Sequence, residues 1–227
     1  MLVQIRNLLT AEEVSRCRDE LDAVAWTDGR VTAGEQSARA KSNLQLAAGD
    51  PTGRELGALI QSALRRDPTF VSAALPRRVY PPLFNRYEAG MGFGAHVDNA
   101  IRRGDGSGAG LRTDLSATLF LTDPDEYDGG ELVIEDVFGE QAVKLPAGDL
   151  VLYPASSVHR VNPITRGARL ASFFWIQSMV RDDGQRTLLF NLDGAIRETR
   201  AALGDETATA VKLTGAYHNL VRMWAEA

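Results

Sequence analysis

The order of apolar and polar residues predicts a helix close to the start of the chain. Thr10 and Glu13 have the spacing of a capping box, in which each side chain bonds the backbone of the other residue. After them, apolar residues recur with the period of one helix face. This stripe consists of Val14, Cys17, Leu21 and Val24. We therefore expect an amphipathic helix that ends near residues 26–29.

A second helix is expected from Asp50 and Pro51 onward. Proline is favoured at the first helical position, because the N–H that it lacks would have no partner there. An apolar stripe follows at helical spacing and consists of Leu56, Leu59, Ile60 and Leu64. Asp67 and Pro68 predict its end, because the residue before a proline avoids the helical conformation.

From about residue 78 to residue 178 the pattern changes to short apolar runs between Gly, Pro and Asp clusters, which is typical of an antiparallel all-β region. Strands are expected at residues 115–121, 131–134, 143–145, 150–153 and 170–177. Residues 102–110 are Gly-rich and polar, which predicts a mobile loop. This loop is either a flap beside a nearby site or a plain surface loop.

Helical periodicity returns after Met179. One stripe, which Gly204 should terminate, consists of Leu188, Leu189, Leu192, Ile196 and Leu203. A last helix carries Val211, Tyr217, Leu220, Val221 and Trp224. These stripes either pack on the β-region or face another subunit, and the second reading predicts a homo-oligomer.

The length of 227 residues allows one substantial core and a small extension. We expect an N-terminal helical flank at residues 1–77, a catalytic β core at residues 78–180 and a C-terminal helical extension at residues 181–227. This is a mainly β fold with flanking helices.

Composition and charge narrow the class of protein. The net charge of −5 gives no general attraction to nucleic acid or to anionic lipid, so neither is expected as a partner. Cys17 is the single cysteine, which excludes an intrachain disulfide and fits a reducing cytoplasm. On the apolar stripe, it is expected to be a buried residue rather than a reactive thiol. No apolar run approaches the length of a membrane span, so we expect a cytoplasmic protein.

Three side chains form a candidate metal site. His96 and Asp98 stand at i and i+2, which on an extended strand places both on the same face. His159 follows a strand-like run and a short turn, from where a neighbouring strand can direct it at the first pair. Two imidazoles and one carboxylate are typical of Fe(II) oxygenases, because they leave adjacent positions open. The third histidine, His218, lies in the last helix and is expected to have a structural or interface role.

Arg169 separates this reading from a hydrolytic zinc site, which could use the same ligands. It begins the final apolar β-run, ten residues after His159. A guanidinium inside a β-barrel needs an anion, and a carboxylate that accepts two hydrogen bonds is its natural partner. Arg169 is therefore expected to hold the distal carboxylate of a 2-oxoglutarate co-substrate.

The motifs around these residues resemble the Fe(II)/2-oxoglutarate dioxygenases of the prolyl-4-hydroxylase type, and most closely the PKHD-type hydroxylases. The resemblance is carried by residues 85–90 (NRYEAG), His96-Val97-Asp98, residues 127–132 (YDGGEL), residues 146–154 (PAGDLVLYP), His159 and Arg169. In the tail, residues 172–178, 185–191 and 215–220 are also similar to this family. The likeness covers nearly the whole chain.

The resemblance implies a double-stranded β-helix, or jelly-roll, core and a requirement for Fe(II), 2-oxoglutarate and the activator ascorbate. An N-x-Y motif at the corresponding place in AlkB-type demethylases contacts the co-substrate, so Asn85 and Tyr87 are further candidates for that role. Prolyl hydroxylases often use Lys where this chain has Arg169, which changes the donor and keeps the charge. Asp98 argues against the halogenating relatives, because these replace the carboxylate ligand with a small residue.

The expected reaction is the hydroxylation by O2 of a small-molecule or peptidyl substrate, coupled to the conversion of 2-oxoglutarate to succinate and CO2. A role in bacterial iron uptake is implied by the resemblance only. Two alternatives remain open: an AlkB-like oxidative demethylase, for which the sequence offers no basic groove, and a non-catalytic cupin-like metal-binding protein.

Overall fold

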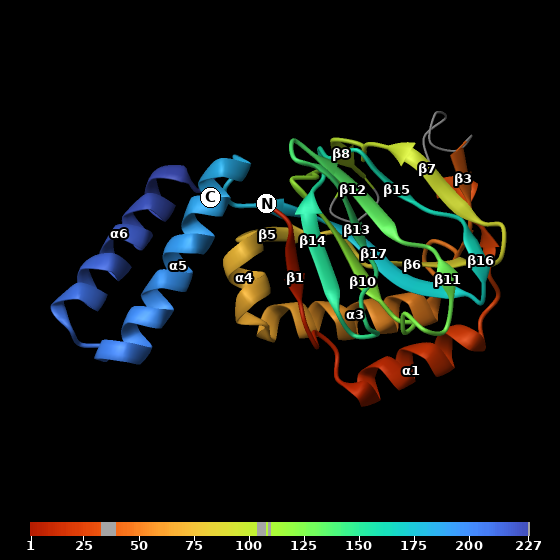
Figure 1. The fold of residues 1–227 in the computed structure, drawn as a ribbon, viewed down its shortest axis with the longest axis horizontal. Coiled ribbons are helices and arrows are strands. Elements are labelled where there is room, and N and C mark those ends of the chain that lie inside the picture. The colour runs from red at the N-terminus through yellow and green to blue at the C-terminus, as the bar shows by residue number, and fades with distance from the viewer. Residues whose placement is uncertain (33–39, 104–107, 109, 227) are drawn as a thin grey trace.

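A β-rich body and a separate pair of helices make up the protein in a computed structural model, which describes residues 1–32, 40–103, 108 and 110–226 (Figure 1). Helices α1 and α3 run along one side of the body, and helices α5 and α6 lie at its end. The strands of the body form two main sheets. This is the jelly-roll architecture expected from the sequence.

The larger sheet contains eight strands, almost all of them antiparallel neighbours that are distant in sequence. In sheet order it consists of β1 (Val3–Ile5), β14 (Leu150–Pro154), β10 (Leu115–Phe120), β17 (Arg169–Ser178), β6 (Leu83–Tyr87), β4 (Leu44–Gln45) and β2 (Thr27–Asp28), with β5 (Pro76–Val79) paired to β17. All residues of the inner strand β10 are buried, including the polar Ser116 and Thr118.

The smaller sheet contains five strands and carries both site histidines. Its order is β13 (Gly139–Val143), β12 (Leu132–Asp136), β15 (His159–Val161), β7 (Gly92–His96) and β3 (Lys41–Ser42). Two short ladders complete the described strands: β11 (Asp128–Gly129) with β16 (Ile164–Arg166), and β8 (Ile101–Arg102) with β9 (Leu111–Arg112). Gly129 has a φ of 74°, and a Cβ atom there would lie 2.1 Å from the Pro163 carbonyl oxygen. The first glycine of the YDGGEL motif is therefore required by the backbone.

The N-terminal helices form where the sequence predicts them. Helix α1 (Ala11–Asp22) begins with the Thr10–Glu13 capping box and buries Val14, Cys17 and Leu21. Helix α3 (Pro51–Arg66) has Asp50 as its N-cap residue. A further helix, α4 (Pro68–Ala74), starts at once after it with Asp67 as N-cap, and the 3-10 turn η1 spans Gly29–Thr32. Sequence periodicity missed α4, because two turns are too short to establish a period.

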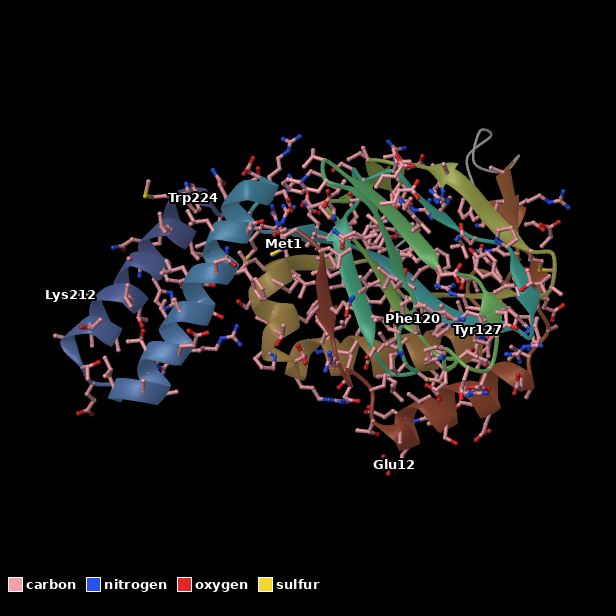
Figure 2. All side chains as sticks on the ribbon, in the orientation of Figure 1. Met1, Glu12, Phe120, Tyr127, Lys212 and Trp224 are labelled. Atoms are coloured by element: carbon pink, nitrogen blue, oxygen red, sulfur yellow. The ribbon has the colours of Figure 1, made fainter. Side chains whose placement is uncertain are left out.

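Apolar residues form one core layer on each face of the larger sheet. Between the sheets lie Tyr87, Phe120, Tyr127, Leu132, Ile134, Val143, Val151, Tyr153, Val161 and Ile164. The opposite face packs against α1, α3 and α4 through residues such as Leu21, Leu56, Ile60 and Phe70. Phe120 and Tyr127 lie inside the β body, whereas Lys212 and Trp224 lie on the distant helical pair (Figure 2). The interior between the two sheets is where the candidate site is found.

The C-terminal helices follow the predicted boundaries. Helix α5 (Asp183–Leu203) ends at Gly204, and helix α6 (Ala208–Trp224) packs back against it. A small apolar cluster of Leu75, Val180 and Leu189 joins α5 to the body at α4. His218 is exposed on α6 and stands apart from the other two histidines.

Some strands differ from the sequence-based expectation. The strand expected at residues 143–145 lies at Gly139–Val143, because β13 is an exposed edge strand whose polar residues hide it from hydropathy. Residues 1–77 carry the expected helices and also supply β1 to β4 and the start of β5, so this flank completes both sheets.

The loop expected at residues 102–110 is described only in part. Arg102 lies in strand β8, and residues 104–107 and 109 lie outside the described residues. None of the described helices is long and apolar enough to cross a membrane.

Candidate active site

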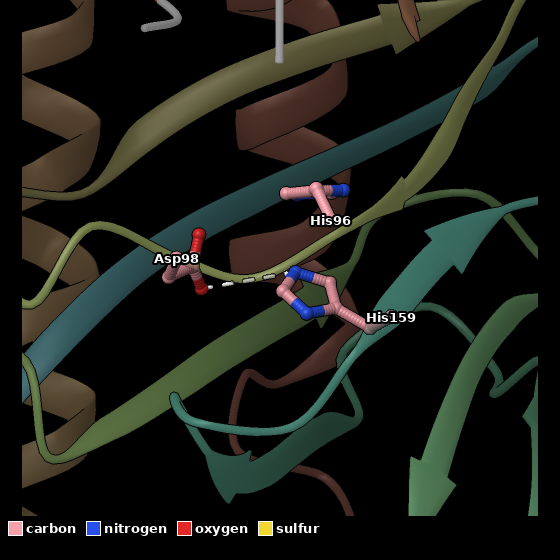
Figure 3. A group of neighbouring side chains, drawn as sticks. All are labelled: His96, Asp98 and His159. Atoms are coloured by element: carbon pink, nitrogen blue, oxygen red, sulfur yellow. Dashed lines mark ion pairs between the residues drawn. The ribbon is translucent and has the colours of Figure 1, made fainter. Parts of the chain in front are cut away.

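The two site histidines come from adjacent antiparallel strands. His96 ends β7 and His159 begins β15, and the two residues are direct Cα partners in the ladder. This pairing brings the imidazole rings to a centroid separation of 4.3 Å. One ligand atom from each of His96, Asp98 and His159 lies within 4.8 Å of the others, and the three side chains converge in Figure 3. The sequence-predicted triad is therefore assembled at one point.

Asp98 reaches this point by a route that the sequence did not predict. Strand β7 ends at His96, so Asp98 lies beyond it and not on the same strand face. The Ser116 hydroxyl of β10 donates a hydrogen bond of 2.6 Å to Asp98 Oδ2, and the same oxygen lies 3.7 Å from His159 Nε2 (Figure 3). The carboxylate is therefore positioned by a side chain of the opposite sheet. The expectation of one strand for both ligands was therefore wrong at Asp98, because the strand has already ended at His96.

Backbone carbonyls orient both imidazoles. His96 Nδ1 lies 2.9 Å from the Gly94 carbonyl oxygen, and His159 Nδ1 lies 3.0 Å from that of Ser157. With Nδ1–H as the donor in each case, both Nε2 lone pairs are available to a metal. Burial, followed by the proximity of His159, lowers the pKa of His96 to about 4. His96 is therefore neutral at physiological pH, as a metal ligand must be.

Arg169 lies inside the barrel, as expected. It begins β17, its side chain is 1% exposed, and its guanidinium lies 4.9 Å from the centre of the Phe120 ring and 5.6 Å from that of Tyr87. Its Nε has no hydrogen-bond partner among the described residues. A buried cation with an unused donor is costly unless an anion binds there.

Tyr87 and Asn85 lie next to Arg169 on strand β6. Arg169 is the Cα partner of Tyr87, and Ala171 is the partner of Asn85. Burial raises the pKa of Tyr87 despite the nearby positive charge of Arg169, so its hydroxyl is protonated at neutral pH and can donate. Asn85 is 7% exposed, and its Oδ1 has no partner within the described structure.

The candidate metal ligands and the candidate co-substrate residues line one pocket between the two sheets. The triad and Arg169 both line it, with Asn85 and Tyr87 beside Arg169. The three ligand side chains therefore fit a chelated metal. The buried Arg169 guanidinium fits the far carboxylate of a dicarboxylate that binds this metal. The residues that are present satisfy the chemical requirements of Fe(II) and 2-oxoglutarate.

Sequence reasoning missed several residues of this pocket. Ser116 and Thr118 are polar residues at alternate positions in an otherwise apolar strand, which is a pattern that could have been read as a polar face toward a site. Lys41, Arg102 and Trp175 also line the pocket. Arg102 lies only four residues after Asp98, in the segment expected as a possible flap, whereas Lys41 and Trp175 are remote from the triad in sequence and no local motif joins them to it.

Comparison with known protein families identifies the family of the chain. Residues 82–177 match the 2OG-Fe(II) oxygenase superfamily, and residues 183–226 match the PKHD-type hydroxylase C-terminal domain. A PKHD-type hydroxylase of Gluconobacter oxydans is 63% identical over 226 residues, covering 100% of both chains. The chain belongs to the PKHD-type hydroxylases. Another family member, from Methylobacillus flagellatus, is 59% identical over 226 residues with the same full coverage.

Solved structures share the fold of this PKHD-type hydroxylase. A prolyl-4-hydroxylase of Pseudomonas putida superposes with a TM-score of 0.53 at 22% identity, over 78% of this chain and 92% of that one. HygX of Streptomyces hygroscopicus, solved with nickel and 2-oxoglutarate, gives a TM-score of 0.51 at 16% identity, over 76% and 81% of the two chains. At such identities the likeness concerns the fold alone.

Family membership establishes the class of enzyme. The PKHD-type hydroxylase is a 2-oxoglutarate-dependent dioxygenase that uses Fe(II) and O2 and acts as a hydroxylase.

Proposed function

We propose that this enzyme hydroxylates a small-molecule or peptidyl substrate, with iron held by His96, Asp98 and His159 and 2-oxoglutarate held by Arg169. The observation that carries the proposal is the shared pocket, in which a preassembled triad and a buried guanidinium with an unused N–H face the same interior space. Neither feature is needed for the stability of the fold, because each is a cost in an empty pocket.

Each residue has a defined task in this proposal. The two Nε2 atoms and the Asp98 carboxylate bind the metal on one side and leave adjacent positions for ligands. Arg169 pairs with the distal carboxylate of 2-oxoglutarate, and the protonated Tyr87 hydroxyl and Asn85 add polar contacts beside it. Phe120 and Tyr153 line the buried interior and keep water from the reacting centre.

When bound, Fe(II) and 2-oxoglutarate supply the oxidant: one oxygen atom of O2 enters the substrate C–H bond as hydroxyl, the other enters succinate, and CO2 is released. The protein contributes orientation and a dry, fixed electrostatic environment. We also propose that ascorbate acts as an activator that keeps the iron reduced, on the basis of the family resemblance.

Hydroxylation is favoured over an AlkB-like demethylation and over a non-catalytic metal-binding role. An AlkB-like demethylase needs a basic groove for nucleic acid, and the net charge of −5 argues against one. A non-catalytic cupin-like protein does not need a buried guanidinium beside its metal.

We further propose that the enzyme is a cytoplasmic homo-oligomer and that it has a role in bacterial iron uptake. Growth of a deletion strain under iron limitation tests the role in iron uptake.

The direct test is formation of succinate by the purified enzyme with Fe(II), 2-oxoglutarate, O2 and a metabolite extract. Products that gain one oxygen atom are then sought by mass spectrometry. His159→Ala should lose iron, and with it the anaerobic visible charge-transfer band and succinate formation, because two ligands bind metal much more weakly than three. A His218→Ala variant, which removes the exposed histidine of α6, is the matched control and should retain all three. Full iron content and an intact band in His159→Ala would remove this residue from the site.

A further inference from the structure

Arg102 is a second arginine of the active-site pocket with no task in the proposed reaction. It lines the pocket from strand β8, and its guanidinium carbon lies 3.9 Å from the centre of the Trp175 ring and 5.8 Å from that of Tyr80. These ring contacts fix its position. Among the described residues, no carboxylate or hydrogen-bond acceptor pairs with the guanidinium, so its N–H groups are available to the pocket.

The ladder places Arg102 on the metal side of the pocket. Trp175 is the Cα partner of Ser116, and Ser116 bonds the proposed metal ligand Asp98. Arg169 lies six residues before Trp175 on β17, so the two Cα atoms are about 20 Å apart along the strand. A 2-oxoglutarate molecule held by Arg169 and the triad would therefore leave Arg102, at the opposite end of β17, to another ligand.

Charge balance supports a second anion. The two positive charges of Fe(II) and the one of Arg169 balance Asp98 and the two carboxylates of 2-oxoglutarate, which leaves Arg102 uncompensated. Lys41 lines the same pocket wall, and burial, with the positive charge of Arg102 as the next cause, lowers its pKa to about 8. The uncompensated positive charge on the metal side is therefore that of Arg102.

We propose that Arg102, stacked on Trp175, binds a carboxylate or phosphate group of the substrate, and that the enzyme hydroxylates a small organic anion. The inference rests on the proposed function, since it assumes that 2-oxoglutarate occupies the Arg169 side. Phe173 and Trp175, whose rings meet edge to face at 5.6 Å, supply an apolar wall for the part of the substrate that carries the C–H bond.

Binding of neutral and anionic probes tests this assignment. The enzyme is loaded with Zn(II), which permits no turnover, and with saturating 2-oxoglutarate. Phenylacetate, benzyl phosphate and the neutral phenylacetamide are then titrated by calorimetry. At least one anion should bind about tenfold or more tightly than the amide, since a charge-assisted pair is available only to the anions. The tighter of the two anions identifies the headgroup.

Two variants separate the site from general electrostatics. Arg102→Gln should reduce the anion preference to less than about threefold. Arg103→Gln makes the same change of net charge at the exposed neighbouring residue and should keep the preference. Equal binding of acid and amide, no binding of any probe, or an intact preference in Arg102→Gln overturns the inference. Failure of the Zn(II)-loaded enzyme to bind 2-oxoglutarate would instead contradict the proposed function.

Discussion

Arg169 shows how a single buried charge can indicate a candidate co-substrate site. Its position inside the barrel was predicted from the sequence, because a polar residue at the start of an apolar β-run needs a partner. The partner residues could not be predicted in the same way. Tyr87 lies opposite Arg169 only because β6 and β17 pair in one particular register.

Arg169→Gln should damage 2-oxoglutarate use and leave iron binding intact. Loss of one partner from a buried charged pair costs about 3–5 kcal/mol, so the apparent affinity for 2-oxoglutarate should fall on the order of 10²–10³-fold. The apparent affinity of Arg169→Lys for 2-oxoglutarate should lie between those of the unmodified enzyme and Arg169→Gln. Lysine keeps the positive charge but cannot donate two parallel hydrogen bonds. The measurement is succinate formation against 2-oxoglutarate concentration, with anaerobic iron titration alongside.

The matched control is Arg166→Gln, three residues earlier. Arg166 is exposed and pairs with Asp128 on the surface, so its loss should leave 2-oxoglutarate use unchanged. A shift of less than about threefold in Arg169→Gln, with iron unchanged, would show that another residue holds the carboxylate.

Ser116 is a positioning residue for the metal site, and its removal should weaken metal binding. Its hydroxyl donates to Asp98 Oδ2 at 2.6 Å, and the residue is 2% exposed. Ser116→Ala should lower the affinity for Mn(II) about 10–100-fold, as is typical when a hydrogen bond to a ligand is lost. Electron paramagnetic resonance of free Mn(II) measures this without turnover.

Two variants control the Ser116 experiment. Ser116→Thr retains the hydroxyl and should restore most of the affinity. Ser172→Ala removes a buried serine of β17 that bonds the Leu83 carbonyl and contacts no proposed ligand, so its metal affinity should equal that of the unmodified enzyme. If Ser116→Ala binds Mn(II) within about threefold of the unmodified enzyme, Asp98 is positioned by other contacts.

At the scale of elements, helices were predictable wherever a cap and a full apolar stripe occurred together. Thr10 with Glu13 and Asp50 with Pro51 marked their helices correctly. Short strands were not predictable. β2, β3 and β4 have two residues each, so they show no alternation. They exist because β3 pairs with the edge of β7, β4 with the edge of β6, and β2 in turn with β4. Tertiary pairing, and not local propensity, decides such elements.

The capping box of α1 should have a measurable effect on stability. The Glu13 N–H donates to Thr10 Oγ1 at 3.2 Å, and the Thr10 N–H donates to Glu13 at 2.9 Å. Thr10→Ala should lower the free energy of unfolding by about 0.5–2 kcal/mol, because the N-terminal amide of the helix loses its acceptor. The midpoint of urea unfolding reports the change. Thr10→Ser keeps the hydroxyl acceptor, so its urea midpoint should stay close to that of the unmodified protein. An unchanged midpoint in Thr10→Ala would show that the cap does not contribute to stability.

At the scale of the whole molecule, the jelly-roll followed from family resemblance rather than from periodicity alone. Apolar runs indicated an antiparallel β-region, but strand order depends on pairings such as β10 with both β14 and β17, which no local pattern specifies. The two C-terminal helices expected from the sequence are present as α5 and α6. Its role in assembly stays a prediction.

The helical pair should mediate self-association. Leu188, Leu203, Val211 and Met223 are 52%, 61%, 59% and 73% exposed on α5 and α6, which is a large apolar exposure for a small element. Sedimentation at micromolar concentration should show a species heavier than the 24.7 kDa chain. Met223→Glu should shift the population toward the monomer.

Val137→Glu provides the comparison for that experiment. Val137 is 91% exposed at the β12–β13 turn, away from the helical pair, so its replacement should leave the sedimentation profile unchanged. A single 24.7 kDa species in the unmodified protein would show that the helical pair does not drive self-association.

The pairing of β1 with β14 has a consequence for how the protein is made. Val3 has Leu152 as its Cα partner, so the first strand must wait until most of the chain has been synthesised. At roughly 5–20 residues per second, this interval is on the order of 10–30 s on the ribosome. During it, the apolar side chains of Val3 and Ile5 have no sheet to join. Until β14 has been synthesised, this segment therefore stays open to non-native association, which makes the pairing of β1 a late step of folding.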